Sequence, residues 1–509
     1  MRTAEDIGRG LASARAPRLI HEGERIHIVG AAGAGAAAAL LLADRVGARA
    51  SGCDPGAPSP YTAAAGAAGL VVVTAHDPAH VIRDGQVLVD RLAVTKALTA
   101  TAPDHPELVA ARLLGIPTES WQQVIADVCV TRGSRLVGIA GTHGKSTSAG
   151  WLLHVLTAAR RDPSGFVGAL LPAALVGGAP ATARWGDGGD FVVEADEYAG
   201  NFDAFRPAVA ALLNAEWDHP DVFADEAAVL AAFERWIRAM TGGPAAAKPI
   251  LIVNVGDPGA AAVAQRLAGW PGSLVTVALS GAHGSIAPGA GAPMAVTGHL
   301  EMGEGGRQRL LIEGLSCGRL ETTVALPGRH NAANALVVAA VADAMGVPGD
   351  AIAAALASFP GVGRRLELKG EPRGVTIVDD YGHHPTAIGA SIAALRARYP
   401  GRRLWAVCEP LTFHRTAAML EAFADALTAA DRVAVADIWA GRDTDISNTS
   451  SAALAAATAV RGTPATAPGS VDETADYLAA EVRSGDVVLV MGGGRAYVIA
   501  ERLIELLGG

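Results

Sequence analysis

Residues 141–147 read Gly-Thr-His-Gly-Lys-Ser-Thr and lie between an apolar run at 136–140 and an amphipathic helix expected over 149–159. In such a loop the backbone N–H groups point at phosphate oxygens, the lysine neutralises their charge, and the hydroxyl after it binds Mg²⁺. Ile139 stands where the usual loop has its first glycine, so this is a shortened variant. The alternative is a turn with an incidental lysine, but the chain has only four lysines and one stands here. We therefore predict phosphate binding by Gly141, Thr142, His143, Gly144, Lys145, Ser146 and Thr147.

Carboxylates close the next apolar strand, expected at 191–195, with Glu194, Asp196 and Glu197 at its end. Hard oxygen ligands suit Mg²⁺, and a carboxylate that faces the loop hydroxyl would complete its coordination. The alternative is a solvated acidic strand end. His219 follows the strand expected at 209–213 and stands beside further carboxylates, which favours a functional role over that of an ordinary structural histidine.

Three further clusters each follow an expected strand or open a helix. Asn331 and Asn334 open an Ala-rich helix, where their amides either read a purine edge or cap the helix. Residues 379–385 pack two carboxylates, a phenol and two imidazoles into one loop, which is costly for a mere connection. Residues 409–416 and 492–495 either shape a substrate rim or form ordinary turns.

The first segment also has the features of a nucleotide-binding unit. A strand at 25–29 is followed by Gly30, Gly33 and Gly35, then by a helix and a second strand that ends before Asp54. This is the spacing of a βαβ nucleotide-binding half-fold. The amides of Gly33 and Gly35 could hold a pyrophosphate, although the glycine spacing is not the standard one. A tight turn without a ligand is the alternative.

These motifs need sheets to position them, and 509 residues suffice for two to four domains. Strands alternate with helices along the chain, which predicts an α/β fold of three consecutive domains with parallel sheets. We place them at 1–133 (Rossmann-like), 134–361 (P-loop ATPase-type) and 362–509 (dinucleotide-binding-like). In the third we expect helices at 386–398, 417–429 and 471–482. The Gly/Pro/Ala-rich stretch 280–306 predicts loops and short antiparallel strands without a catalytic role.

Composition excludes several classes of function. The net charge of −10, without blocks of like charge, disfavours binding to nucleic acid or to an anionic membrane. The longest apolar run, 28–43, is shorter than the roughly 20 residues of a membrane span. Acidic residues precede it, which fits a signal peptide poorly. The four cysteines lack metal or redox spacing and predict small buried side chains of a cytoplasmic protein. Nothing in the sequence indicates the oligomeric state.

Taken in order, the motifs resemble the Mur ligase family, the ATP-dependent amide-forming ligases of peptidoglycan synthesis. The resemblance covers nearly the whole chain and includes the glycine turn with Asp54, Gly-Thr-His-Gly-Lys-Ser, Glu-Ala-Asp-Glu-Tyr198, Asp218-His219-Pro, Pro-Gly-Arg-His-Asn331-Ala-Ala-Asn334, Arg364-Arg365 and Asp-Asp-Tyr-Gly-His-His-Pro385. It implies a UDP-binding domain, a central ATPase domain, and a third domain that brings in the amino acid and closes over ATP.

The resemblance also implies a role for each matching residue. Lys145 would hold the β- and γ-phosphates of ATP, Ser146 would bind one Mg²⁺, and Glu194 and His219 would serve the metals. The remaining implied contacts are adenine for Asn331 and Asn334, nucleotide for Arg365, ribose for Asp379 or Asp380, and the incoming amino acid for Tyr381, His383 and Arg415.

The implied reaction joins an amino acid to UDP-N-acetylmuramate. ATP converts the lactyl carboxylate into an acyl phosphate, which the amine then attacks. Among family members the alanine-adding ones resemble this chain most, so L-alanine is the expected amino acid. However, Glu409-Pro-Leu411 replaces their usual Gln-Pro-His, and His414 and Arg495 also depart from their pattern. A ligase that attaches a preformed peptide, or a nucleotide-binding homologue without turnover, therefore stays open.

Overall fold

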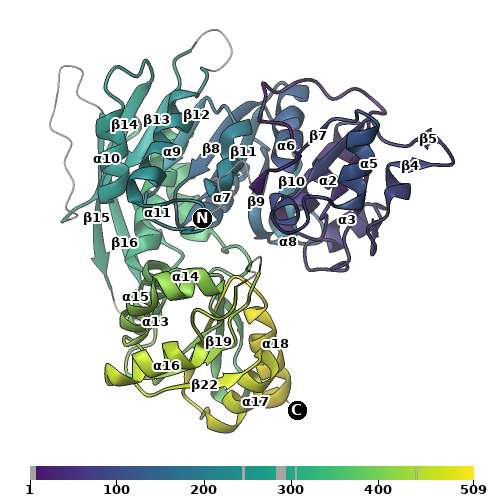
Figure 1. Cartoon of the computed structure of the whole chain (residues 1–509). Helices are drawn as coiled ribbons and strands as arrows, with labels where there is room; N and C mark the ends of the chain where they lie inside the picture. Colours follow the sequence, from purple (N-terminus) through teal and green to yellow (C-terminus); the bar gives the residue numbers. More distant parts are fainter. Residues whose placement is uncertain are drawn as a thin grey trace.

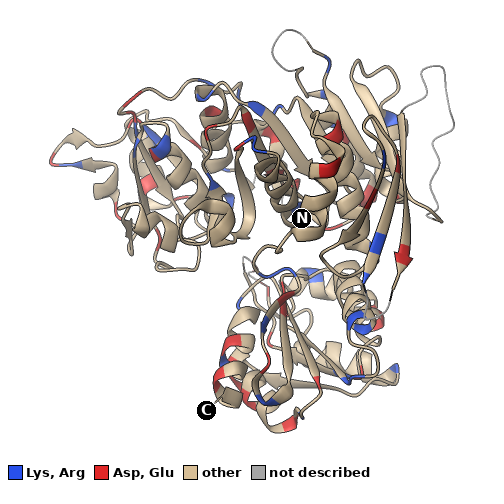
Figure 2. Cartoon of the chain, turned by 180° about the vertical axis from the view of Figure 1, so that it is seen from behind, with Lys and Arg blue, Asp and Glu red and all other residues tan. Residues whose placement is uncertain are grey.

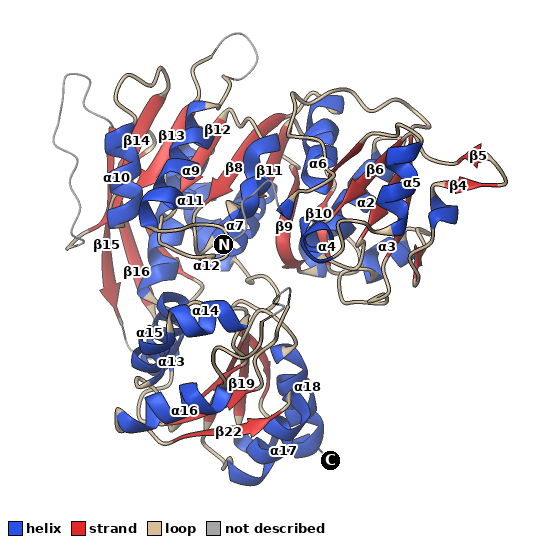
Figure 3. Ribbon diagram, in the orientation of Figure 1, coloured by secondary structure: helices blue, strands red, loops and turns tan. Residues whose placement is uncertain are grey.

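The computed structural model describes residues 7–242, 247–281, 294–303, 307–441, 443 and 445–508. The strands form three large sheets that follow one another along the chain (Figure 1). In each, strands are flanked by helices, as the predicted α/β class requires (Figure 3). The predicted boundaries, 133/134 and 361/362, fall between the sheets, and they stay predictions.

The first sheet is parallel, in the order β3-β2-β1-β6-β7. Its strands are β1 (Arg25–Val29), β2 (Arg49–Cys53), β3 (Val72–Val73), β6 (Arg91–Val94) and β7 (Thr118–Ser120). The flanking helices include α2 (Ala34–Arg45), α3 (Ala63–Ala67), α4 (Lys96–Thr101), α5 (Pro106–Leu113), α6 (Trp121–Thr131) and the 3₁₀ helix η1 (Pro78–His80). Two short strands, β4 (Ile82–Arg83) and β5 (Gln86–Val87), form a separate hairpin. Side chains alternate along a strand, so Ile26 and Ile28 pack with α2 and α6, whereas Val29 packs with α5.

The central sheet has ten strands in the order β10-β9-β11-β8-β12-β13-β14-β15-β16-β17. They are β8 (Arg135–Ala140), β9 (Ser164–Leu171), β10 (Ala181–Arg184), β11 (Asp190–Ala195), β12 (Val209–Leu212), β13 (Ile250–Asn254), β14 (Ser273–Leu279), β15 (Met294–Met302), β16 (Gln308–Leu315) and β17 (Gly318–Val324). Helices α7 (Lys145–Ala158), α11 (Arg329–Ala344) and α12 (Gly349–Ser358) share one core, and α9 (Glu226–Arg238) and α10 (Pro258–Arg266) share the other. Shorter elements are α8 (Ala173–Val176) and η2 (Tyr198–Ala204).

The third sheet has the order β18-β19-β23-β20-β21-β22, in which only β18 is antiparallel to its neighbour. The strands are β18 (Glu367–Gly370), β19 (Thr376–Asp380), β20 (Leu404–Cys408), β21 (Arg432–Ala436), β22 (Ala465–Gly469) and β23 (Val487–Met491). Helices α13 (Pro385–Arg398), α15 (Leu420–Leu427) and α16 (Ser451–Val460) cover one face, and α17 (Val471–Glu481) and α18 (Ala496–Gly508) cover the other.

The structure corrects three predicted elements. Helix α7 begins at Lys145 rather than at 149, because its polar first turn lacks the apolar periodicity from which the helix was predicted. The helix predicted at 417–429 is two helices, α14 (Phe413–Ala418) and α15, which break at Met419. Within the predicted loop region, β15 is a nine-residue strand antiparallel to β16, and residues 282–293 and 304–306 lie outside the described residues.

Surface and cysteine properties follow the predictions with one exception. Acidic and basic residues are scattered over all three parts of the chain (Figure 2). Within the described residues no helix has the length and apolarity to cross a membrane. All four cysteines are free, and Cys53, Cys129 and Cys408 are buried as predicted. Cys317 is exposed, which the prediction had wrong, because it lies in the turn between β16 and β17.

Candidate functional site

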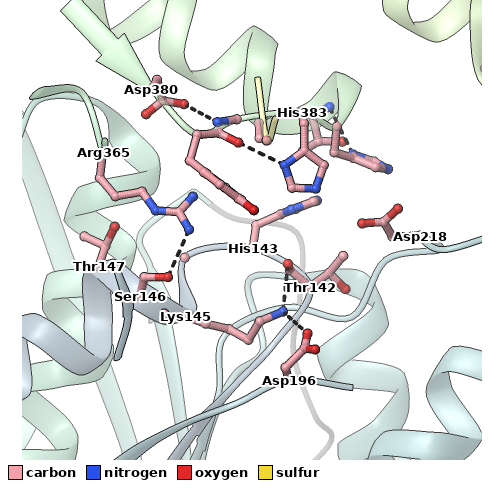
Figure 4. A pocket seen from close by; sticks show the side chains of 18 of the residues that line it. Thr142, His143, Lys145, Ser146, Thr147, Asp196, Asp218, Arg365, Asp380 and His383 are labelled. Atoms are coloured by element: carbon pink, nitrogen blue, oxygen red, sulfur yellow. Dashed lines mark hydrogen bonds and ion pairs between the residues drawn. The ribbon is translucent and has the colours of Figure 1, made fainter. Parts of the chain in front are cut away.

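A cavity of about 600 Å³ lies where the central strands end and the third domain faces them (Figure 4). The carboxyl ends of β8, β11 and β12 carry the sequence motifs to this edge, and the loop after β19 covers it from the opposite side. Open α/β sheets bind ligands at this edge of their parallel strands. The cavity therefore gathers motifs that are more than 200 residues apart in the sequence.

The loop after β8 has the conformation of a phosphate-binding turn. Gly141 and Gly144 have φ of 145° and 81°, which only glycine adopts readily. A Cβ on Gly144 would also lie 2.8 Å from the side-chain oxygen of Asn334. Lys145 opens α7 directly after the turn, so the first-turn amides, unpaired within the helix, border the cavity. Within the loop itself, the amides of Thr142 and His143 donate to Asn214.

Lys145 is held inside the loop by groups of opposite charge. Its Nζ donates to the carbonyl oxygens of Gly141 (2.7 Å) and Thr142 (3.2 Å) and lies 2.8 Å from Glu197 Oε2 and 3.4 Å from Asp196 Oδ1. Burial disfavours the ammonium ion, but the two carboxylates outweigh it and raise the pKa of Lys145. Burial beside Asp196 raises the pKa of Glu197. The lysine therefore stays charged, which phosphate binding requires.

Ser146 and Glu194 meet as a metal-binding pair would. Ser146 Oγ donates to Glu194 Oε1 at 3.0 Å, and the other carboxylate oxygen accepts from the backbone amide of Gly168 at 2.6 Å. Arg365 reaches over from the third domain and donates to Ser146 Oγ at 2.9 Å (Figure 4). A hydroxyl and a carboxylate oxygen are donors that Mg²⁺ prefers.

His219 belongs to a different group of ligand atoms from Glu194. One ligand atom each of Asp196, Glu197 and His219 lie within 4.8 Å of one another. Glu197 Oε1 is buried and has no hydrogen-bond partner among the described residues, which suits an oxygen that binds a cation. The sequence motif contains both carboxylates, but by itself it does not show which of its three acids face His219.

The charged groups predicted near the amino acid already have partners in the protein. Arg415 Nη2 lies 2.8 Å from Asp218 Oδ1 and 3.0 Å from His219 Nδ1, while its buried Nε has no hydrogen-bond partner in the described part of the chain. Burial opposes ionisation of Asp218, but His219 and Arg415 hold its pKa well below the ordinary value. Arg415 thus ties the third domain to the central one, and its Nε, which has no partner among the described residues, is a donor left for a carboxylate ligand.

His383 is positioned as a neutral imidazole. Its Nδ1 lies 2.9 Å from the carbonyl oxygen of Tyr381, which can only accept, so Nδ1 carries the proton. Burial, together with nearby Arg415, lowers the pKa of His383 well below its ordinary value. Since His383 lines the cavity, its Nε2 is a proton acceptor at neutral pH.

The residues predicted at the nucleoside separate into two groups. Asn331 and Asn334 both line the cavity, although Asn331 Nδ2 donates to the carbonyl oxygen of Pro327. Asp380 also lines it, but its carboxylate accepts from Leu366 N, Gly382 N and Ser391 Oγ. Asp379 is fully buried, and its carboxylate contacts Arg364 instead.

His143 of the predicted loop, Glu216, His384 and Thr386 form a further group that lines the same cavity. His143 Nε2 lies 2.9 Å from Glu216 Oε2, and Thr386 Oγ1 donates to Glu216 Oε1 at 2.5 Å. The ring of His384 lies 4.7 Å from that of His143. Only the juxtaposition of the loop after β12 with the start of α13 reveals this group, because its members are up to 243 positions apart.

The N-terminal glycine turn borders both this cavity and a second one of about 1160 Å³. Asp54 accepts from the amides of Ala32 (3.0 Å) and Gly56 (2.7 Å), so it stabilises the turn itself. Gly30 adopts a φ of 85°, and Gly33 precedes α2 as its N-cap. A Cβ on Gly35 would lie 2.2 Å from the Trp121 ring. The close packing of α2 on α6 therefore explains by itself why this position is glycine.

The second cavity connects the first and third domains. Gly33, Ser59 and Tyr61 line it from the first domain, and Arg364 and Arg495 line it from the third. It shares several lining residues with the first cavity, namely Ala34, Gly168, Leu326, Arg365, Leu366, Tyr381, Trp439 and Gly493. A ligand bound along the glycine turn would reach the phosphate loop through these shared residues.

Known proteins match this chain along most of its length. Three family models match, described as the Mur ligase family catalytic domain (residues 25–131), the Mur ligase middle domain (139–342) and the Mur ligase glutamate ligase domain (364–494). UDP-N-acetylmuramate–L-alanine ligase of Roseiflexus sp. (strain RS-1) is 37% identical over 492 residues, which cover 94% of this chain and 98% of that protein. The enzyme of the same name from Mycobacterium avium (strain 104) is 35% identical, with 95% of each covered.

Solved structures agree in fold. UDP-N-acetylmuramate-alanine ligase of Thermotoga maritima superimposes with a TM-score of 0.74 at 23% identity, covering 94% of this chain and 98% of that one. A murein peptide ligase from Psychrobacter arcticus gives a TM-score of 0.69 at 22% identity, with 96% and 99% covered. From the three family models and the full-length relatives, the chain belongs to the Mur ligase family.

Proposed function

We propose that this protein is an ATP-dependent ligase that joins L-alanine to the lactyl carboxylate of UDP-N-acetylmuramate in peptidoglycan synthesis. The observation that carries the proposal is the cavity that combines the charged Lys145 in a phosphate loop, the Ser146–Glu194 pair and neutral His383. The relatives of that name, similar over nearly their full length, support the choice of substrates. A cytoplasmic location and the absence of nucleic-acid and membrane partners stay predictions.

The loop and Lys145 bind the phosphates of ATP and reduce the repulsion between them and the incoming carboxylate. The carboxylate oxygen attacks the γ-phosphorus, the bond to the β-phosphate oxygen breaks, and ADP leaves an acyl phosphate behind. Arg365, which contacts Ser146 from the third domain, closes the site over the phosphates. Closure excludes water, which would otherwise hydrolyse the acyl phosphate.

Amide formation then needs an unprotonated amine. Alanine reacts as its free amine, which attacks the acyl carbon to form a tetrahedral intermediate, and His383 Nε2 accepts the proton that the attacking nitrogen then loses. The intermediate collapses as the carbon–oxygen bond to phosphate breaks. Arg415 Nε, buried and unpaired among the described residues, provides a donor for the alanine carboxylate.

Two groups of residues fit magnesium ions. Ser146 with Glu194 would hold one, and Asp196 and Glu197 with His219 would hold the other, where the partnerless Glu197 Oε1 supports the fit. Bound Mg²⁺ supplies neutralisation of the phosphate charge during transfer. Of the remaining predicted residues, Thr142, Gly144, Thr147, Asn331 and Asn334 would complete the nucleotide pocket.

A ligase that attaches a preformed peptide to the same sugar nucleotide is the second candidate. Leu411 and Glu409 favour it, because Leu411 lines the cavity where the alanine-adding members usually place a polar group. The fold similarity to a murein peptide ligase is compatible with it.

The test is phosphate release from ATP and Mg²⁺ with UDP-N-acetylmuramate and one acceptor at a time. We expect release with L-alanine and formation of the corresponding amide. Release only with an L-alanyl peptide would transfer the assignment to the second candidate. If ATP and the sugar nucleotide bind but no acceptor yields phosphate, the protein is a nucleotide-binding homologue without turnover, and the proposal fails.

A further inference from the structure

A second set of ligand-type side chains lies in the first domain, on the face of the sheet covered by α5. His27 comes from β1, Cys53 ends β2, His80 ends the 3₁₀ helix η1, and Glu107 lies in the first turn of α5. One ligand atom each of these four residues lie within 4.8 Å of one another. None of the four lines either cavity described above, so the proposed ligase reaction does not use them.

The distances between the atoms approach those of a tetrahedral zinc site. Bond lengths of about 2.3 Å to sulfur and 2.0–2.2 Å to nitrogen and oxygen place neighbouring ligand atoms about 3.3–3.6 Å apart. Cys53 Sγ lies 3.3 Å from His27 Nε2 and 3.2 Å from Glu107 Oε1. His27 Nε2 lies 3.7 Å from Glu107 Oε2, and His80 Nδ1 lies 2.9 Å from Glu107 Oε1. These four distances differ from that range by at most 0.4 Å, and the remaining separations within the group are at most 4.8 Å.

The buried carboxylate of Glu107 also favours a bound cation in this cluster. Glu107 and Cys53 are fully buried, and His27 is 2% exposed. Among the described residues, the ion-pair contacts of Glu107 are with the imidazoles of His27, His76 and His80. A buried carboxylate without a full positive charge beside it is costly. One divalent ion with one thiolate and one carboxylate would make the site neutral.

Neighbouring groups orient the ligand atoms. Ser51 Oγ lies 2.8 Å from His27 Nδ1, which leaves Nε2 to face the sulfur. The amide of Asp77 donates to Glu107 Oε1 at 2.9 Å. His76 Nδ1 lies 3.2 Å from Cys53 Sγ, and the ring of His105 packs against His76. Both ring nitrogens of His105 are buried and have no hydrogen-bond partner within the described ranges. Such outer contacts fix imidazole orientation in metal sites.

We propose that His27, Cys53, His80 and Glu107 bind one Zn²⁺ as a structural site. Four protein ligands leave no open position, which is the arrangement of a structural rather than a catalytic zinc. On binding, the thiol proton leaves to solvent and the thiolate bonds to the metal. The ion would tie β1, β2, η1 and α5 together directly behind the glycine turn, because the Cys53 carbonyl oxygen accepts from the amides of Gly30 and Ala31.

The experiment uses the full-length protein without a polyhistidine tag. Zinc is quantified by mass spectrometry, then removed with a chelator, and Co²⁺ is titrated in with excess Mg²⁺ present to occupy the ATP site. We expect one zinc per chain and, with Co²⁺, thiolate-to-cobalt charge-transfer absorption in the near ultraviolet. The ATP site contains no cysteine among its lining residues, so this absorption does not arise there.

Matched cysteine variants locate the signal. Cys53→Ser should abolish the absorption, whereas Cys129→Ser should retain it. Cys129 is a buried cysteine of the same domain whose sulfur donates to the Ser134 carbonyl oxygen. Glu107→Gln should weaken cobalt binding at least tenfold. Wild-type protein that contains no zinc and shows no charge-transfer absorption with Co²⁺ would overturn the proposal, as would a band that persists in Cys53→Ser. This result does not depend on ligase activity.

Discussion

The central domain meets its two neighbours through junctions of opposite character. Toward the first domain, one continuous apolar core joins α2 and α6 to the central sheet. The ring of Trp121 on α6 packs edge-on against Phe166 of β9, with 5.2 Å between the ring centres. Burial of this kind removes apolar surface from water and resists separation.

Toward the third domain the contacts are mostly polar. Arg365 contacts Ser146, Arg415 contacts Asp218, and Thr386 contacts Glu216. The cores on the two faces of the third sheet consist of that domain's own side chains, apart from partly buried Trp217. Water can replace polar contacts at little cost, and domains joined in this way move relative to one another by default. We therefore expect the third domain to open and close over ATP while the first two move together.

The largest effect is expected at the phosphate loop that the polar junction covers. Lys145→Ala removes the buried charge that offsets the phosphates, so we expect kcat/KM to fall by at least about 10³-fold. The fold should persist, because protonation of Glu197, whose pKa burial already raises, relieves the charge left unpaired. Phosphate release measures the activity and circular dichroism the fold. Lys248→Ala, which changes the exposed lysine of the same domain, is the control; retained activity in Lys145→Ala would refute the loop assignment.

The apolar junction should instead determine stability. Trp121→Ala deletes a large, partly buried side chain that packs against the shared core, and we expect the free energy of unfolding to decrease by about 3 kcal/mol, the low end for loss of an aromatic side chain. Thermal and urea unfolding followed by tryptophan fluorescence and circular dichroism measure it. Trp439→Ala is the comparison, because Trp439 is 42% exposed and its removal should change stability much less. Equal losses in the two variants would contradict the continuous core.

The polar junction should determine turnover more than stability. Arg415→Ala removes the partner of Asp218 across the junction, and we expect kcat to fall by about 10²-fold, or about 2.7 kcal/mol. The melting temperature should fall less than in Trp121→Ala, since an open junction lets water solvate Asp218. Arg432→Ala, an exposed arginine of the same domain, is the control. If Arg415→Ala lost as much stability as Trp121→Ala and kept its turnover, the proposed difference between the two junctions would be wrong.

The smallest expected effect concerns Glu409, a buried carboxyl group at a position where the alanine-adding members usually have glutamine. Burial raises the pKa of Glu409 to about 7, and its Oε2 has no partner among the described residues. The folded protein therefore retains a proton that the unfolded chain releases above its ordinary pKa of 4.5, so wild-type stability decreases as pH rises through this window. Glu409→Gln should be more stable than wild type by about 1–2 kcal/mol at pH 8 and similar to it at pH 5. Parallel urea titrations at both pH values test this; a pH-independent difference would contradict it.

Individual motifs could be predicted from sequence because each is local. The loop at 141–147 could be predicted from its glycines, its lysine, which is rare in this chain, and the strand and helix patterns on either side. The helix start at Lys145 and the break at Met419 could not be read in the same way, because polar first turns and kinks lack apolar periodicity. The pairing of Arg415 with Asp218 joins positions 197 residues apart, and no local pattern records it.

By itself, the sequence determined the α/β class, the order of the motifs and which side chains carry the chemistry, since alternation of strands and helices and short spacings are properties of neighbouring residues. Only the tertiary structure decided which carboxylate faces Ser146 and which face His219, that Asp54 and Asp380 stabilise their own loops, and that His27, Cys53, His80 and Glu107 meet. The reason is physical: packing of distant strands and helices sets these distances, and burial then fixes the charge each group can carry.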